Sequence, residues 1–196
     1  MGPLWQLIFW GVLGWSAWHP HDYPTWLLEV LPALIAWALL LATRSRFRFT
    51  PLLYALILVH CLILMIGGKY TYALVPAGDW VSGILGWSRN NYDKLGHLAQ
   101  GFVPAMVARE LIVRLQVIST RGWRFSLITL SILGISAAYE FIEWWVALLS
   151  DEAAESFLGT QGYVWDTQSD MFMALIGAVC AQLLLARIHD RQLQQA

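Results

Sequence analysis

The stretch Asn91–Ala105, NYDKLGHLAQGFVPA, opens a long apolar segment but carries an aspartate, a lysine, a histidine and a glutamine near its start. Asp93, His97 and Gln100 follow the i, i+4, i+7 spacing that places side chains on one face of a helix. A charged side chain inside a membrane costs at least about 2.5 kcal/mol and normally faces a bundle interior or a water-filled cavity. The stretch therefore predicts one polar wall of a site inside a helical bundle.

The composition around this stretch indicates a membrane protein. Of the 196 residues, 58% are hydrophobic and only 13% are charged, whereas soluble domains average about 25% charged residues. The 12 tryptophans suit the membrane–water boundary, where an apolar ring and a polar N–H group are both satisfied. A net charge of −1 excludes a broad basic surface, so we expect no nucleic-acid partner.

Six apolar segments approach the roughly 20 residues that a membrane-spanning helix needs. Each must be helical, because backbone groups in lipid have no water to bond. The sequence thus predicts an all-α membrane protein, one polytopic transmembrane domain over residues 1–196. Its helices are expected at about 4–18, 26–42, 51–67, 93–115, 125–149 and 170–186. The first segment is short enough to lie at the interface instead, and segment 75–87 is expected to be interfacial.

Arginine placement predicts the direction of the chain through the membrane. The link between the second and third segments, the borders of the fourth link and the tail after the sixth segment carry Arg44, Arg46, Arg48, Arg114, Arg121, Arg124, Arg187 and Arg191. The links after the first and fifth segments contain no lysine or arginine. By the positive-inside rule, we expect a bundle of six transmembrane helices with cytoplasmic N- and C-termini.

With that topology, acidic residues from several helices come to a similar depth on the outer side. Glu140 and Glu143 are three residues apart, Asp166 and Asp170 are four apart, and Glu29 lies in the first turn of the second helix. Like charges in a low-dielectric site raise one another's pKa, so these groups cannot all stay ionised without help. A bound cation, shared protons, or helix caps and interhelical hydrogen bonds would each explain them.

A divalent metal is the first of these explanations. Carboxylates and imidazoles are ligands for Mg, Mn, Fe or Zn, and the sequence does not choose among these metals. The predicted metal ligands are His97, Glu140, Glu143, Asp166 and Asp170. The predicted catalytic residues are Asp93, His97 and Glu140, with His97 or Asp93 as general base. Lys94 is the only nearby lysine or arginine on these helices, and we expect it at the membrane boundary.

Other polar residues in the apolar segments are interpreted as structural. His60 stands alone near the middle of the third segment and is expected to pack through hydrogen bonds. Glu110 and Arg114 can pair at i, i+4. A structural role is favoured for Arg109 as well, with extension of its side chain toward the inner headgroups as the alternative.

Three sequence blocks, NYDKLGHLAQGFVPAMVARE, AAYEFIEWW and FLGTQGYVWDTQSDMFMALIGA, together resemble the YjdF-type bacterial inner-membrane proteins, a family of unknown function. The resemblance covers most of the chain between about residues 90 and 178. It implies a multi-pass protein of the bacterial inner membrane and supplies no activity.

A more remote resemblance is to the VanZ-like membrane proteins, which are associated with glycopeptide-antibiotic resistance. Asp93, Lys94 and His97 match the Asp-Lys-x-x-His block of that pattern. Glu143 stands where the pattern has glutamine, and Asp170 stands where it has asparagine. Both departures add potential negative charge and favour a cation or a shared proton at the site.

Three classes of function remain open from the sequence. The first is a metal-dependent enzyme acting on a lipid or lipid-linked envelope substrate from the outer leaflet. The second is a small cation- or proton-coupled transporter, since polar residues on intramembrane helices mark such paths. The third is a structural or regulatory membrane subunit. Membrane lipids are expected partners in each case, and the substrate and oligomeric state are left open.

Overall fold

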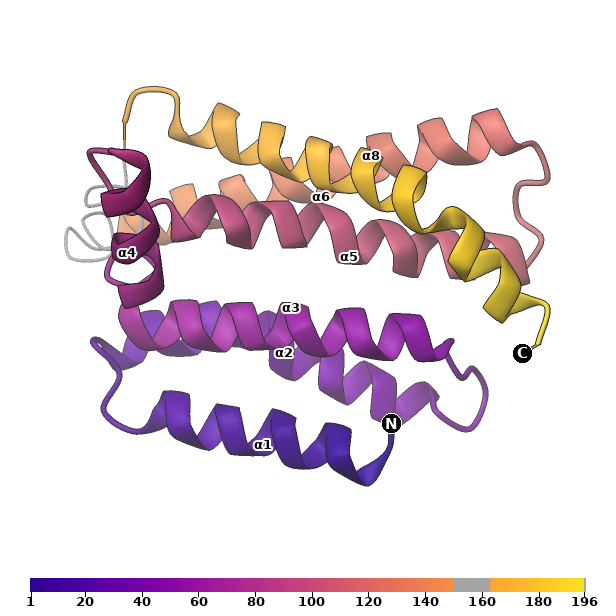
Figure 1. The fold of residues 1–196 in the computed structure, drawn as a ribbon, viewed down its shortest axis with the longest axis horizontal. Helices are drawn as coiled ribbons and strands as arrows, with labels where there is room; N and C mark the ends of the chain where they lie inside the picture. The colour runs from indigo at the N-terminus through magenta and orange to yellow at the C-terminus, as the bar shows by residue number, and fades with distance from the viewer. Residues whose placement is uncertain (150–162, 196) are drawn as a thin grey trace.

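The computed structural model describes residues 1–149 and 163–195, and in this part of the chain it is entirely helical. The helices are α1 (Pro3–Ala17), α2 (Tyr23–Thr43), α3 (Pro51–Tyr70), α4 (Pro76–Leu85), α5 (Tyr92–Arg114), α6 (Arg121–Leu149) and α8 (Asp166–Leu193). All but α4 run along the length of one bundle, and α4 lies across one end of it (Figure 1). Both chain ends and the α5–α6 link lie at the opposite end.

The predicted helices are all present, with bounds shifted by a few residues. The largest difference is α8, which begins at Asp166 rather than 170 and continues to Leu193. Segment 75–87, expected as interfacial, contains the ten-residue helix α4. By length and composition, four described helices are able to cross a membrane, namely α2, α3, α6 and α8. The all-helical class is therefore confirmed.

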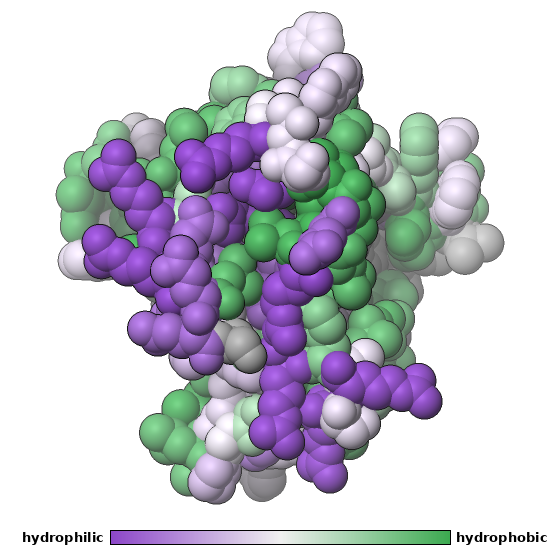
Figure 2. Space-filling view, turned by 90° about the vertical axis from the view of Figure 1, so that its right-hand side faces the viewer, coloured by the Kyte–Doolittle hydropathy of each residue, from purple (hydrophilic) through white to green (hydrophobic). Residues whose placement is uncertain are grey.

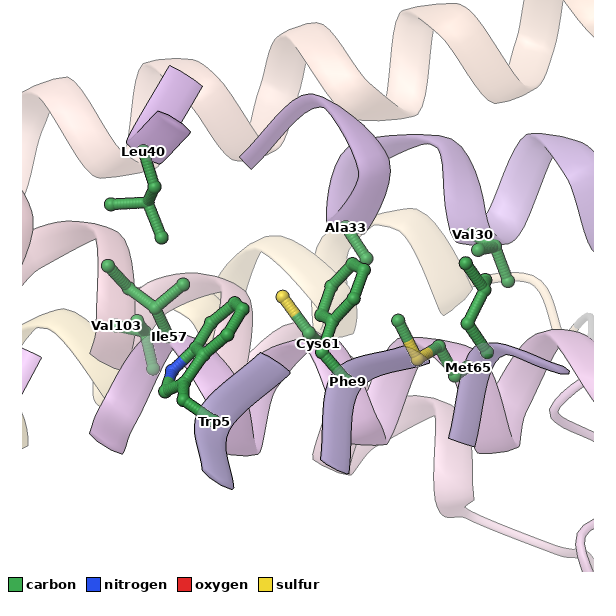
Figure 3. Packing of buried hydrophobic residues seen from close by; sticks show 10 residues of the cluster. Trp5, Phe9, Val30, Ala33, Leu40, Ile57, Cys61, Met65 and Val103 are labelled. Carbon is green, nitrogen blue, oxygen red and sulfur yellow. The ribbon is translucent and has the colours of Figure 1, made fainter. Parts of the chain in front are cut away.

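Two apolar clusters hold the helices together. In the first, α1 and α2 pack on α3 through side chains that include Phe9, Ala33 and Cys61, with Val103 reaching in from α5 (Figure 3). The second joins α3, α5, α6 and α8 around residues such as Met106. Helix α3 takes part in both clusters and so connects the two halves of the bundle.

Helices α5 and α8 form the most extensive helix pair, and their backbones touch. A Cβ atom added at Gly101 would lie 1.9 Å from the carbonyl oxygen of Ala174, and one at Gly177 would lie 2.2 Å from the carbonyl oxygen of Leu98. Small residues are a known means of bringing helices this close in membranes. Glycine at these two positions therefore sets the separation of α5 and α8.

A buried polar network fastens the end of the bundle opposite α4. The Glu110 carboxylate accepts hydrogen bonds from the Thr50 N–H (3.0 Å) and hydroxyl (2.8 Å). His189 Nε2 lies 2.9 Å from the same carboxylate, and the predicted pair with Arg114 is present at 3.1 Å. Glu110 and His189 are both 0% exposed. The network joins α5, α8 and the start of α3.

Arg109 has the favoured structural role, and its side chain does not extend outward from the bundle. Its side chain is buried, and it donates to His189 Nδ1 (2.8 Å) and to Asp190 (2.6 Å) on α8. Because a guanidinium only donates, His189 Nδ1 must accept, which leaves its Nε2–H to donate to Glu110. Nothing in the sequence around His189 marked it as a partner of α5.

Replacement of Gly101 by alanine tests the backbone contact. We expect Gly101→Ala to lower stability by about 1–3 kcal/mol, because its Cβ would overlap the α8 backbone and the helices must separate. Gly134→Ala on α6, where a Cβ meets nothing within 4 Å, is the matched control and should not destabilise. Thermal unfolding in detergent measures both variants. Equal stability of the two would contradict the role of the contact.

Candidate functional site

A cavity of about 230 Å³, whose largely apolar wall carries many titratable side chains, lies inside the bundle toward the α4 end. Helices α2, α3, α5, α6 and α8 all contribute side chains to it. Its titratable lining residues are Glu29, His60, Tyr72, Asp93, His97, Tyr139, Glu143, Asp166 and Asp170. The cavity therefore collects most of the acidic residues that the sequence placed at a common depth.

Asp93 and His97 meet on one face of α5, as their spacing predicts. His97 Nε2 lies 3.3 Å from Asp93 Oδ1, and His97 Nδ1 lies 3.2 Å from Gln100 Oε1. The imidazole is buried, with 6% exposure. Both ring nitrogens thus have partners from the same helix, and these contacts fix the orientation of the ring.

Lys94 connects α5 to α8 at the edge of the cavity. Its ammonium lies 2.5 Å from Asp170 Oδ1 and 2.7 Å from Asp166 Oδ1, with Asp93 Oδ2 at 3.6 Å. Arg89 adds a second cation, 3.0 Å from Asp166 Oδ1. The Lys94 side chain is only 15% exposed, and its position relative to the membrane boundary stays a prediction. Basic partners therefore neutralise part of the acid set.

Among the described residues, one group has the arrangement of a metal site. Ligand atoms of Asp93, His97 and Asp170 all lie within 4.8 Å of one another. Of the predicted ligands, His97 and Asp170 belong to this group, and Asp93 joins them although it was predicted as a catalytic residue. Asp166 instead faces Lys94 and Arg89.

The two α6 glutamates differ in their relation to the cavity. Glu143 lines it, whereas Glu140 lies behind His97, with its Oε1 3.9 Å from His97 Nδ1. Glu140 is 7% exposed, and its Oε1 has no hydrogen-bond partner within the part of the chain that the structure describes. A buried carboxylate oxygen without a donor is costly and marks a position for a proton or a cation.

Four further side chains complete the wall and were not predicted as site residues. Glu29 comes from α2, His60 from α3 and Tyr139 from α6, and Tyr72 lies in the turn after α3. His60 was expected to pack in the core and instead lines the cavity. Burial raises the pKa of the Tyr72 hydroxyl well above its ordinary value, and the nearby Glu29 adds to this shift. Tyr72 therefore stays a neutral hydrogen-bond donor.

Comparison with known proteins identifies the class of the chain. Residues 2–191 match the model of a family described as "Predicted membrane protein (DUF2238)", and the chain belongs to this family. It is also 56% identical, over 175 residues, to the inner membrane protein YjdF of Escherichia coli (strain K12). That similarity covers 89% of this chain and 84% of the relative. No solved structure matches.

These findings confirm the YjdF-type resemblance and the predicted location in the bacterial inner membrane. They carry no activity, because neither the family description nor the name of the relative states one. The VanZ-like resemblance stays a prediction from the sequence. Any function must therefore be argued from the cavity itself.

A double-mutant cycle tests the Lys94–Asp170 ion pair. We expect Lys94→Met to cost about 3–5 kcal/mol, because it leaves buried carboxylates without their ammonium partner. Adding Asp170→Asn should recover part of that cost, giving a coupling of about 0.5–3 kcal/mol. Unfolding in detergent provides the free energies. Lys69→Met is the control and should be additive with Asp170→Asn, because the Lys69 ammonium contacts the carbonyls of Trp15 and Trp18 and the Trp15 and Tyr70 rings, far from Asp170 in the sequence.

Proposed function

We propose that the chain crosses the inner membrane six times, with both ends in the cytoplasm. Support comes from the distribution of charge along the bundle. Both chain ends and the α5–α6 link, which Arg114 and Arg121 border, lie at one end of the bundle (Figure 1). The acidic cavity lies toward the other end. The positive-inside rule then assigns the arginine-bearing end to the cytoplasm. The cavity opens toward the outer leaflet or the periplasm.

Within this cavity, we propose a divalent-cation site formed by Asp93, His97 and Asp170. The main support is that one ligand atom from each of these residues lies within 4.8 Å of the other two. The cavity around them also contains Glu29, Glu143 and other acidic residues. Lys94 and Arg89 supply two positive charges against five lining carboxylates, so an acid surplus remains. A cation is the ligand that this surplus attracts.

The proposed reaction is metal-dependent chemistry on a lipid or lipid-linked envelope substrate. An acidic cavity repels a phosphate group unless a metal ion lies between them. A divalent ion on Asp170 and its neighbours would supply that bridge and polarise a phosphoryl oxygen or activate water. The position of the cavity inside a membrane bundle favours a substrate that arrives from the bilayer.

The acid–base roles follow from which carboxylates face the cavity. Glu143 lines the cavity and is the proposed general base toward water or substrate. Glu140 lies behind His97, and its oxygen without a donor is suited to hold the imidazole or to take its proton. With Asp93 and His97 as metal ligands, Glu143 takes the general-base role that the sequence assigned to His97 or Asp93.

A cation- or proton-coupled transporter is the second candidate. The observation that favours it is the same acid surplus together with the unpartnered oxygen of Glu140, since protons or cations moving through a membrane use such groups. The third candidate, a structural or regulatory subunit, is favoured by the ion pairs of Lys94 that join α5 to α8.

Elemental analysis of the purified protein tests the metal site. By plasma mass spectrometry we expect about one divalent ion per chain in the wild type, and loss of that ion in His97→Ala and Asp170→Ala. His60→Asn is the matched control, because His60 lines the same cavity outside the Asp93, His97 and Asp170 group. It should retain the ion. No metal in the wild type, even after divalent ions are supplied, would remove the proposed mechanism.

Lipid analysis of cells tests the proposed reaction. Cells that lack the gene should accumulate one lipid or lipid-linked species, and expression of the wild type or of His60→Asn should reverse this. Asp93→Asn should not reverse it, because the amide is a poorer metal ligand than a carboxylate. An envelope lipid profile unchanged by deletion contradicts the enzyme proposal. Glu140-dependent cation flux in proteoliposomes would then favour the transporter.

A further inference from the structure

Two grooves meet at the end of the bundle that carries the arginines. The first is polar, has a volume of about 660 Å³ and is lined by Arg46, Arg48, Thr50, Arg114 and Gln192 among others. It lies where the α2–α3 link passes the ends of α5 and α8. Figure 2 looks onto this end of the bundle and shows hydrophilic side chains gathered on it.

The second groove is apolar along most of its length. It runs between α1 and α3, has a volume of about 940 Å³ and is lined by Leu4, Ile8, Tyr54 and Leu58 among others. Arg44 and Arg48 also line it. The two grooves share Ser45, Arg48, Phe49 and Pro51. The polar first groove, which carries the arginines, therefore continues directly into the apolar second groove.

Three of the four arginines that line these grooves have no carboxylate partner among the residues that the structure describes. Arg44, Arg46 and Arg48 are exposed, and no carboxylate from the described ranges 1–149 and 163–195 pairs with them. Arg114 is different, because Glu110 accepts a hydrogen bond from it and the Phe47 ring stacks 4.0 Å from its guanidinium carbon. Three unpaired positive charges thus surround the mouth of the apolar groove.

We propose that these joined grooves bind one anionic diacyl phospholipid. The phosphate lies against Arg44, Arg46 and Arg48, whose guanidinium groups match phosphate oxygens in charge and geometry. An acyl chain lies between α1 and α3 along Leu4 and Leu58. Basic pockets between transmembrane helices are suited to anionic headgroups, and the adjoining apolar groove distinguishes a lipid from a free phosphate. This site is separate from the acidic cavity and does not depend on the function proposed for it.

Native mass spectrometry of the full chain in detergent, with phosphatidylglycerol or phosphatidylcholine added, tests the lipid site. We expect one tightly bound phosphatidylglycerol and much weaker phosphatidylcholine. In Arg44→Gln/Arg48→Gln, phosphatidylglycerol binding should fall about 30-fold, from the usual contribution of two arginines beside an anionic headgroup. Arg121→Gln/Arg187→Gln removes the same charge outside both grooves and should bind as the wild type does.

A second pair of variants tests the acyl-chain groove. Leu4→Trp places a large ring in it, whereas Leu7→Trp lies on the same helix outside it. The two leucines are 68% and 71% exposed, so both variants should fold, and thermal unfolding checks this. We expect only Leu4→Trp to weaken phosphatidylglycerol binding.

Three results would overturn the proposal. Equal binding of both phospholipids would show that the site does not select a negative headgroup. An equal loss in the two double-arginine variants would show attraction to general positive charge alone. Competition by glycerol phosphate, with Leu4→Trp binding like Leu7→Trp, would show a site for a free phosphate. Metal content, measured on the same samples, reports on the acidic cavity independently.

Discussion

Contact between the backbones of α5 and α8 at Gly101 and Gly177 is the constraint on which the acidic cavity depends. Because no Cβ separates the helices there, the first turns of α5 and α8 lie close enough for Lys94 to reach Asp166 and Asp170 directly. A larger residue at either glycine would separate the helices and lengthen these contacts. Apolar packing of α3 against the pair adds the third wall of the site.

The two ends of the bundle differ in how completely their buried carboxylates are paired with hydrogen-bond donors and cations. Opposite α4, Glu110 has a donor for each oxygen, from Thr50, His189 and Arg114, and its network is complete. In the cavity, carboxylates outnumber cations, and beside it Glu140 has an oxygen without a donor among the described residues. A complete network is suited to fastening helices, whereas an incomplete one lowers stability and is a common property of functional sites.

The same asymmetry separates the two sites proposed here by charge. The proposed cation site lies in the acidic cavity within the bundle, whereas the proposed phospholipid site lies at the exposed Arg44, Arg46 and Arg48 at the opposite end. A lipid bound between α1 and α3 would also support α1, whose 15 residues are few for a bilayer span. On these two proposals, the chain combines an interior cation site with a surface site for the surrounding lipid.

The sequence by itself determined the membrane class, the positions of the helices and the pairing of polar residues within a helix. These properties depend on local composition and on spacing, so Asp93 with His97 and Glu110 with Arg114 were both predictable. Only the tertiary structure decided which helices meet. The Lys94–Asp170 and Arg109–His189 pairs join residues 76 and 80 positions apart in the sequence. Residue spacing within a helix does not predict pairs at such a separation. The approach of α5 to α8 fixes those pairs. Gly101 and Gly177 are far apart in the chain, and each must meet the backbone of the other helix before the polar side chains can touch.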